Sequence, residues 1–237
     1  MSIHHDGMDE RINIAIDGPA GAGKSTVARS VAEALGYIYI DTGAMYRAVT
    51  WSAREAGLNV EDDQAVTDLA RELEITLAPG PDGQVVLLNG QDITDKIRSR
   101  DVNLHVSRVA ANDAVRLLLV EMQRKLAADK GVVMDGRDIG SHVLPNAELK
   151  IYLTASVQER ALRRFRESGD ASGITLEQME REIEERDRKD MERVVSPLIR
   201  AEGAILLDST GIPAGEVVSQ IVTLGRKKLA EAKQDVI

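Results

Sequence analysis

The chain of 237 residues contains no cysteine. Disulfide bonds and thiolate metal sites are therefore excluded, which suits a reducing compartment. No uninterrupted apolar run approaches the roughly 18 residues that a membrane-spanning helix needs. The first residues, Met1–Asp6, are polar and lack the apolar core of a secretion signal. We expect residues 1–10 to be a flexible tail of a cytoplasmic protein that has no membrane partner.

Basic residues are also fewer than acidic ones. There are 30 Lys and Arg residues against 39 Asp and Glu residues, which gives a net charge of −9. Because nucleic acid is a polyanion, an acidic chain binds it poorly, and we expect no nucleic-acid partner. Any basic site must therefore be local. The length allows one sizeable core plus an appendage, and we expect a monomer.

The clearest motif is the P-loop pattern G-x-x-x-x-G-K-S within AIDGPAGAGKST, residues 15–26. A strand-like run precedes it and a helical pattern follows it, a context that disfavours a glycine turn formed by chance. Backbone N–H groups of such a loop surround phosphate oxygens. Lys24 would reach the β- and γ-phosphates, and the Ser25 hydroxyl would ligate Mg²⁺. The predicted ATP-binding residues are Gly18, Pro19, Ala20, Gly21, Ala22, Gly23, Lys24, Ser25 and Thr26.

Strand-like apolar runs alternate with helical patterns along most of the chain. The runs lie at 12–16, 37–40, 132–134, 149–153 and 204–207. This alternation predicts an α/β fold, in which helices cover both faces of a five-stranded parallel sheet. Capping-box patterns predict that helices begin at Ser156 and at Thr175.

Two segments depart from this alternation. Residues 75–100 contain two strand-like runs and then Asn89-Gly90, which is typical of a tight hairpin turn. They predict a small antiparallel insert, either a surface decoration or a flap over a second ligand. The polar connector 168–176 joins two arginine-rich helices. It is either a plain surface loop or part of a helical lid that closes over polyanions.

Charged residues follow two of the predicted strands. In parallel sheets, ligands bind beyond the carboxyl ends of the strands. After the run at 37–40 come Thr42, which could simply be a helix N-cap, and Arg47, which could reach over the strand ends. After the run at 132–134, Asp135 is placed to hold water around Mg²⁺ and Arg137 offers a fork for phosphate. A surface turn is the alternative for this second segment.

Two helical segments carry further candidates. The first is predicted from about 106 to 128, where Arg116 considered alone would be an exposed helix arginine. In the second, Arg186, Asp190 and Arg193 are spaced to share one helix face. The alternative for the second segment is a solvated salt-bridge ladder that runs through Glu182, Arg186 and Asp190.

Over nearly its whole length, from about Ile12 to Lys228, the chain resembles the bacterial-type cytidylate kinases among the nucleoside monophosphate kinases. The marks are IAIDGPAGAGKST, YIDTGAMYR, DGRDIG and EERDRKDMER. The resemblance implies transfer of a phosphoryl group from ATP, with Mg²⁺, to CMP and dCMP. It also implies a kinase fold over 11–237, with a core (11–60, 101–158, 194–230), a monophosphate-binding insert (61–100) and a lid (159–193).

The resemblance also implies residue roles. The residues that match base-reading positions are Thr42, Ser107, Arg116 and Asp138. Those that match ribose contacts are Arg186 and Asp190. Those that match the acceptor-phosphate arginines are Arg47, Arg137 and Arg193. Relatives carry Gly where this chain has Ser25, which favours direct Mg²⁺ ligation. The expected catalytic residues are Lys24, Arg137, Arg186 and Arg193.

The expected chemistry needs no general base, because an acceptor phosphate oxygen is already anionic. None of the four histidines falls in these motifs. Catalysis is then positioning and charge neutralisation inside a closed lid. Two alternatives remain open: a P-loop kinase for another small acceptor, such as UMP or shikimate, and a nucleotide-gated switch. Against the switch, no Asn-Lys-x-Asp motif occurs, and Asp208–Gly211, which fits D-x-x-G, is explained by a turn.

Overall fold

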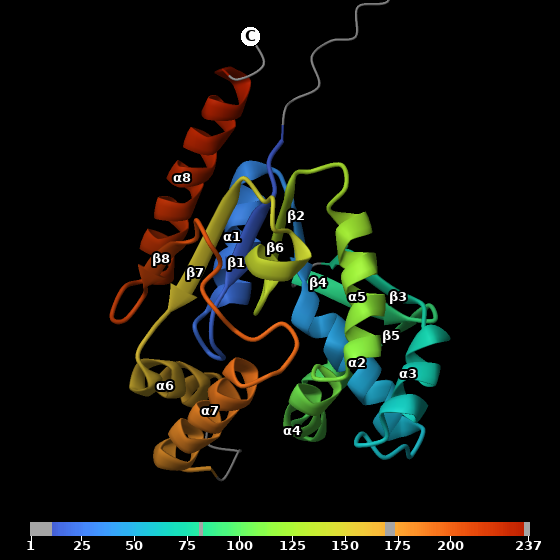
Figure 1. The fold of residues 1–237 in the computed structure, drawn as a ribbon. Coiled ribbons are helices and arrows are strands. Elements are labelled where there is room, and N and C mark those ends of the chain that lie inside the picture. The colour runs from blue at the N-terminus through green and yellow to red at the C-terminus, as the bar shows by residue number, and fades with distance from the viewer. Residues whose placement is uncertain (1–10, 81–82, 169–173, 235–237) are drawn as a thin grey trace, which may run out of the picture.

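The computed structural model describes residues 11–80, 83–168 and 174–234 (Figure 1). The expected tail at 1–10 lies outside the described residues, as does most of the connector at 168–176. Within the described ranges, no helix combines the length and the apolar character needed to cross a membrane.

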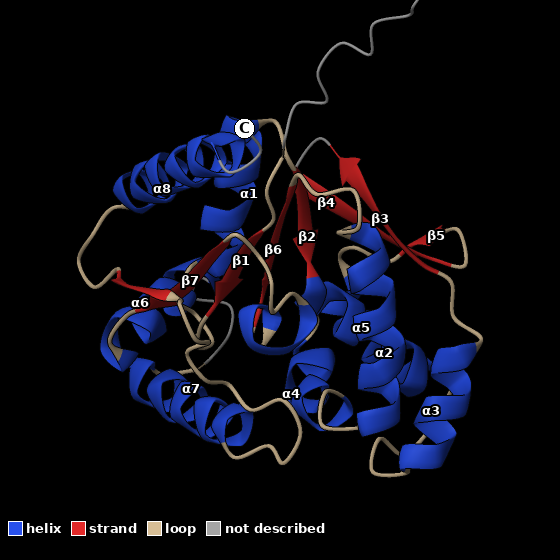
Figure 2. Ribbon diagram, turned by 45° about the horizontal axis from the view of Figure 1, so that its top comes forward, coloured by secondary structure: helices blue, strands red, loops and turns tan. Residues whose placement is uncertain are grey.

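The central element is a five-stranded sheet with the order β2-β6-β1-β7-β8 (Figure 2). Its strands are β1 (Ile14–Asp17), β2 (Ile38–Asp41), β6 (Val132–Gly136), β7 (Leu149–Thr154) and β8 (Ile205–Asp208). Every neighbouring pair is parallel. All five predicted strands are therefore confirmed, each shifted by no more than two residues, as is the α/β class. The carboxyl ends of the strands lie together at one edge.

Helices cover both faces of this sheet. On one face, α1 (Lys24–Leu35) and α8 (Ala214–Gln234) pack on β1 and β7 through side chains that include Val31, Ile221 and Ile151. On the other face, α5 (Asp113–Leu126) and the short π-helical turn η2 (Ile139–Val143) pack on β6. Burial of each such aliphatic side chain contributes about 1.5–3 kcal/mol, so the sheet is a rigid base for the loops at its edge.

The insert contains α3 (Asp63–Arg71), β3 (Ile75–Gly80), β4 (Gly83–Leu88), β5 (Gln91–Asp92) and the 3₁₀ turn η1 (Lys96–Arg98). Its strands form a separate antiparallel sheet, as predicted. Asn89 and Gly90 make the predicted turn, with φ of 49° and 78°. The insert packs against α2 (Thr42–Glu55), where the Lys96 ammonium lies 5.1 Å from the centre of the Trp51 ring.

One prediction about helix length is wrong. The stretch from 106 to 128 is not one helix, because α4 (Arg100–Val109) ends before α5 begins. Asn112 causes the break: its side-chain oxygen accepts hydrogen bonds from the backbone N–H groups of Ala114 and Val115. An asparagine in this position stabilises a new helix start better than it stabilises a helix interior.

Beyond the strand ends lie the two helices of the predicted lid, α6 (Val157–Ser168) and α7 (Leu176–Met191) (Figure 1). Both predicted caps are present. Ser156 Oγ accepts from Glu159 N, and Thr175 forms a complete capping box with Gln178. Because α7 ends at Met191, Arg193 lies past the helix and does not share a regular helix face with Arg186, contrary to the prediction.

The D-x-x-G segment is a turn, as predicted. β8 ends at Asp208, whose Oδ1 accepts hydrogen bonds from both the N–H group and the hydroxyl of Thr210. This arrangement is an ordinary Asx turn, which accounts for the pattern without a nucleotide.

Candidate active site

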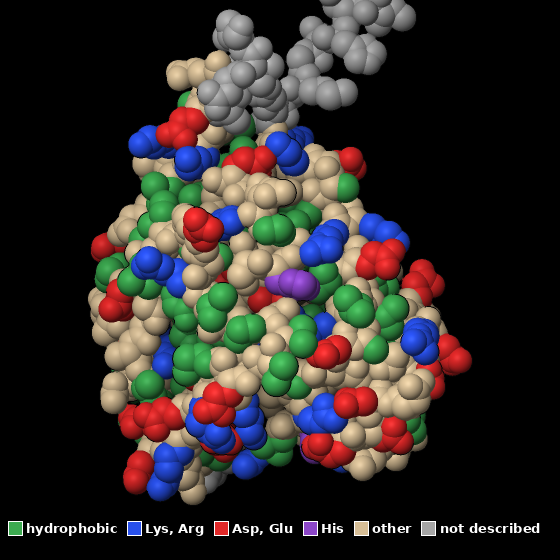
Figure 3. Space-filling model, viewed as in Figure 1, with side chains coloured by type: hydrophobic (Ala, Val, Ile, Leu, Met, Phe, Trp, Pro, Cys, Tyr) green, Lys and Arg blue, Asp and Glu red, His purple; other side chains and the backbone are tan. Residues whose placement is uncertain are grey.

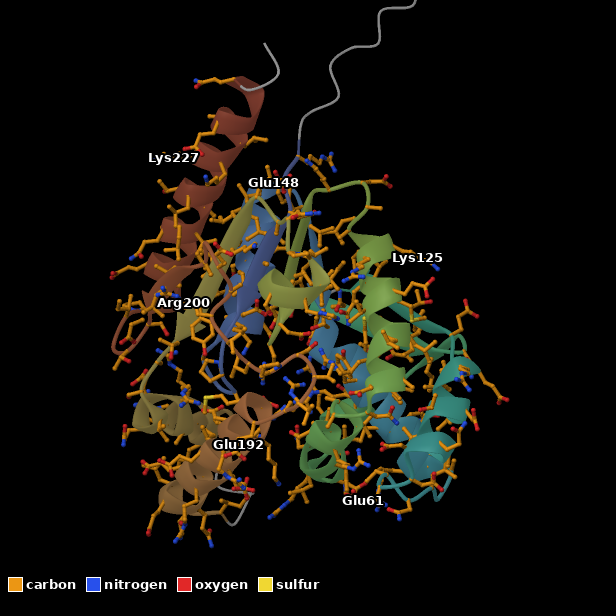
Figure 4. The ribbon with its side chains drawn as sticks, viewed as in Figure 1. Glu61, Lys125, Glu148, Glu192, Arg200 and Lys227 are labelled. Atoms are coloured by element: carbon orange, nitrogen blue, oxygen red, sulfur yellow. The ribbon has the colours of Figure 1, made fainter. Side chains whose placement is uncertain are left out.

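A cavity of about 820 Å³ opens at the carboxyl ends of β1, β2 and β6. The P-loop, the start of α2, the insert, α4, α5 and the lid helices contribute to its wall. In Figure 4, the labelled Lys125 and Lys227 lie on the outer surfaces of α5 and α8 and point away from this region. All nine predicted acceptor-binding residues line the cavity: Thr42, Arg47, Ser107, Arg116, Arg137, Asp138, Arg186, Asp190 and Arg193.

The P-loop joins β1 to α1. Gly18 has a φ of 151°, and a Cβ atom there would lie 1.9 Å from the Leu153 carbonyl oxygen, so only glycine fits. Lys24 is buried, and its Nζ donates a hydrogen bond to the Pro19 carbonyl oxygen at 2.7 Å. Gly18, Pro19 and Ala22 shape the loop behind the cavity. The predicted residues that reach its wall are Ala20, Gly21, Gly23, Lys24, Ser25 and Thr26.

The electrostatics of Lys24 favour an anion. Burial and the nearby Arg137 lower the pKa of Lys24 to about 7. The nearby carboxylates of Asp135 and Asp17 favour the charged ammonium but do not offset this effect, so additional negative counter-charge would stabilise it. A triphosphate beside Lys24 would supply that counter-charge, which is the role that the P-loop pattern predicts.

The two predicted Mg²⁺ residues lie together behind the P-loop. Ser25 Oγ donates a hydrogen bond to Asp135 Oδ2 at 3.1 Å, and the Tyr39 hydroxyl donates to Asp135 Oδ1 at 2.9 Å. Burial and the nearby Asp41 raise the pKa of the Asp135 carboxyl. A hydroxyl and a carboxylate are ligands that Mg²⁺ prefers, so the residues present fit this ion. Tyr39 opens the segment YIDTGAMYR, but its place beside Asp135 depends on the pairing of β2 with β6, which the sequence does not reveal.

Two of the base-reading candidates, Arg116 and Asp138, form a buried ion pair. Arg116 has a relative exposure of 3% and Asp138 one of 4%. Arg116 pairs through Nη2 with Asp138 Oδ2, donates through Nη1 to the Ala110 carbonyl at 3.1 Å, and lies 5.5 Å from the Tyr46 ring centre. Its Nε is buried and has no hydrogen-bond partner among the described residues. The interpretation of Arg116 as an exposed helix arginine is therefore wrong.

Four arginines gather in the same cavity, and three of them surround the Asp190 carboxylate. Arg137 Nε donates to Asp190 Oδ2 at 2.8 Å, and Arg193 Nε donates to the Asp190 carbonyl at 3.3 Å. Burial and nearby arginines lower the pKa of Arg186 to about 9, and burial lowers that of Arg47 to about 10. Positive charges held this close without enough counter-charge make a site for a phosphate group.

Two further alternatives from the sequence are wrong. Thr42 is not the N-cap of α2, because β2 extends to Asp41 and the Asp41 side chain accepts the capping hydrogen bond from Ala44 N. Thr42 Oγ1 instead donates to the Asp135 carbonyl at 2.7 Å. The salt-bridge ladder is not formed either. Glu182 is exposed, whereas Arg186 lines the cavity and its Nε lacks a partner among the described residues.

The lid contacts the P-loop directly, which the sequence analysis did not predict. Asp187 Oδ1 accepts from Ala20 N at 3.1 Å, Arg160 Nη1 donates to the Ala20 carbonyl at 3.0 Å, and the two side chains pair at 2.5 Å. Arg163 Nη2 donates to the Ser209 carbonyl at 2.7 Å. One helix thus places Arg186 in the wall of the cavity and Asp187 against the P-loop. The charged segment in the sequence predicted a helix, but it did not show which of its charged side chains face the cavity and which face the P-loop.

Comparison with known proteins identifies the family of this chain. The family model described as cytidylate kinase matches residues 14–227. The chain belongs to the cytidylate kinase family. It is 51% identical to the cytidylate kinase of Lysinibacillus sphaericus, over 94% of this chain and all of that protein. It is 52% identical to the cytidylate kinase of Geobacillus kaustophilus, with the same coverage.

A solved structure shows the fold at a greater distance. It is an uncharacterized protein from Eubacterium ventriosum, 10% identical, with a TM-score of 0.52 over 91% of this chain and 99% of that one. As a member of the cytidylate kinase family, the chain is a kinase, and ATP is its phosphoryl donor.

Proposed function

We propose that the chain transfers the γ-phosphoryl group of ATP to CMP and dCMP, giving CDP or dCDP and ADP. One observation carries this proposal. The P-loop Lys24 and the arginines around Asp190 line the same cavity, so two anionic substrates can meet within it. The family membership supports cytidine nucleotides as acceptors.

In the donor half, residues 18–26 would hold the phosphates of ATP through backbone N–H groups, and Lys24 would reach the β- and γ-phosphates. Ser25 would hold Mg²⁺ directly, and Asp135 would hold it through water. When bound, Mg²⁺ neutralises charge on the β- and γ-phosphates. Tyr39 and Ser25 keep the Asp135 carboxylate in place by their two hydrogen bonds.

In the acceptor half, Arg116 and Asp138 would read cytosine with Thr42 and Ser107, while Arg186 and Asp190 would contact the ribose. Arg47, Arg137 and Arg193 would hold the acceptor phosphate. A bond forms between an acceptor phosphate oxygen and the γ-phosphorus, and the bond from that phosphorus to the β–γ bridging oxygen breaks. No proton needs to be removed. Lys24, Arg137, Arg186 and Arg193 therefore act by positioning and charge neutralisation.

We propose that the lid (159–193) closes over the core when both substrates are bound, while the insert (61–100) forms the monophosphate-binding wall. Both contribute residues to the cavity wall, which supports this division. Closure would keep water from taking the γ-phosphoryl group.

We also propose a cytoplasmic monomer that binds neither membranes nor nucleic acid. Acidic and basic side chains are intermixed on the face shown in Figure 3, with no broad basic surface there.

The test is a panel of acceptors, CMP, dCMP, UMP and shikimate, incubated with ATP and Mg²⁺ and scored for ADP and for the phosphorylated product. We expect ADP formation to depend on CMP or dCMP and to be much weaker with UMP. Slow ADP formation without any acceptor would indicate a switch instead. Preference for UMP or shikimate would overturn the proposed acceptor.

A further inference from the structure

Gln84, at the start of β4, links the insert to the main sheet. Its side-chain amide makes two hydrogen bonds to the backbone of β2: Asp41 N donates to Oε1 at 3.0 Å, and Nε2 donates to the Tyr39 carbonyl at 2.6 Å. The residue is half-buried and lines the cavity. A side chain of the insert is thus fixed to main-chain atoms of the core.

The two hydrogen bonds of Gln84 lie at the edge of the main sheet. β2 is an edge strand of the five-stranded sheet, and its pairing with β6 uses only one side of its backbone. The N–H and carbonyl groups that face the other side are not part of a ladder with any described strand. The Gln84 amide offers one acceptor and one donor at the spacing of a peptide group, so it acts there as a single residue of a neighbouring strand.

The strand end that Gln84 holds is the one that leads into the acceptor site. Asp41 caps α2 through Ala44 N, and α2 carries Thr42 and Arg47 into the cavity. Within the insert, Val86 N on β4 donates to Thr94 Oγ1 at 2.9 Å, so the segment after β5 is held against β4. The insert residues that line the cavity are Gln84, Val86, Thr94, Asp95 and Arg98.

We propose that Gln84 is a positioning residue for the acceptor nucleotide: its amide fixes the insert on the free edge of β2 and so sets the width of the acceptor half of the cavity. The inference rests on the proposed function. We expect little effect on the donor half, because Gln84 holds the backbone of Tyr39 and not the hydroxyl that contacts Asp135. The P-loop itself is held by β1, α1 and the lid pair formed by Arg160 and Asp187.

The test compares Gln84→Met with Gln91→Met in the full chain. Methionine keeps the length of the side chain and removes both hydrogen bonds, and Gln91 is an exposed glutamine at the start of β5 in the same small sheet. Calorimetry gives Kd for CMP and for a non-hydrolysable ATP analogue, each alone. For Gln84→Met we expect CMP binding up to about 5- to 150-fold weaker, because CMP must then order an insert that the two lost hydrogen bonds no longer hold. ATP-analogue binding should stay within about twofold of the wild type. Gln91→Met should change neither.

A second measurement keeps the inference independent of turnover. Hydrogen exchange at the Asp41 amide should be faster in Gln84→Met than in wild type, while the amides of β1 and β6 stay protected. Unchanged CMP affinity, or equal losses for CMP and the ATP analogue, would refute the positioning role. A wild-type chain that binds CMP but makes no CDP would refute the proposed function and leave the Gln84 comparison valid. A wild type that does not bind CMP would refute both.

Discussion

Replacement of Asp138 by alanine should change which base the enzyme prefers. Cytosine presents an amino donor and an unprotonated ring nitrogen, and uracil presents a carbonyl and an N–H group at the same positions. The Asp138 carboxylate suits the amino group, as carboxylates do in base recognition on DNA, and the arginine suits the ring nitrogen. Arg116 has a buried Nε without a partner among the described residues, which leaves a donor for a ligand.

The magnitude follows from the burial of the pair. A mismatched buried polar group costs about 1–3 kcal/mol, and about 1.4 kcal/mol corresponds to a tenfold change. Wild type should therefore prefer CMP over UMP by about 5- to 150-fold for each mismatched group. In Asp138→Ala, kcat/KM should fall steeply for CMP and much less for UMP, so that the ratio of the two approaches one.

The same substitution should also destabilise the fold. It leaves the Arg116 guanidinium, 3% exposed, without its counter-charge, a change that costs about 3–5 kcal/mol for buried pairs. In a chain of this size, a loss of about 1 kcal/mol in the free energy of unfolding lowers Tm by about 2–4 °C. The activity assays should therefore be run well below the thermal unfolding transition. The CMP-to-UMP ratio is measured within one protein, and it is therefore independent of the folded fraction.

Asp187→Ala is the matched control, because Asp187 is also a buried aspartate paired with an arginine, but its partner Arg160 lies beside the P-loop. It should lower activity with both acceptors by the same factor and leave the ratio unchanged. If Asp138→Ala also lowers kcat/KM for CMP and UMP equally, Asp138 serves phosphate binding or structure, and base selection lies elsewhere.

Three other substitutions test the donor half. Lys24→Ala should lower kcat by several orders of magnitude while Tm stays close to that of wild type, because the charge acts mainly on the transferring phosphoryl group. Tyr39→Phe should raise the Mg²⁺ concentration needed for half-maximal activity and weaken Mg²⁺·ATP-analogue binding, because Asp135 loses one of its two hydrogen-bond donors. Asp187→Leu alone should cost about 3–5 kcal/mol of stability, and the double variant with Arg160→Met should recover most of it.

Each of these has an outcome that contradicts it. Wild-type turnover in folded Lys24→Ala would remove the lysine from the mechanism. An unchanged Mg²⁺ requirement in Tyr39→Phe would mean that Asp135 is held without Tyr39. Equal Tm values for the single Asp187 variant and wild type would show that the pair with Arg160 does not stabilise the lid against the P-loop.

The sheet and the P-loop were predictable because their signals are local. Apolar runs of the right length mark the strands, and the glycine spacing marks the loop. The identity of the α2 cap was not predictable, because Asp41 and Thr42 are both capping residues and the choice depends on whether β2 extends one residue further. The break at Asn112 was missed because helical apolar spacing continues across it.

The directions in which several side chains point could not be predicted from the sequence either. Arg116 lies among apolar neighbours on a helix, and only the packing of α5 against Asp138 and Tyr46 shows that it faces inward. Asp187 is one of several consecutive charged residues. Because neighbouring residues on a helix point to different faces, the sequence does not show which of them faces the P-loop. Gln84 carries no charge and belongs to no motif. Its role depends on the free edge of a strand more than 40 residues earlier in the chain.

The contact of Lys96 with Trp51 gives the enzyme an optical reporter of its own. Trp51 is the one tryptophan of the chain, so all indole emission comes from α2. The ammonium that lies 5.1 Å from its ring belongs to η1 of the insert. Indole fluorescence depends on nearby charge and on water, and any displacement of the insert relative to α2 therefore changes the emission of unlabelled protein. Motion of the acceptor half can be followed by stopped-flow mixing with a monophosphate, separately from chemistry and from the lid.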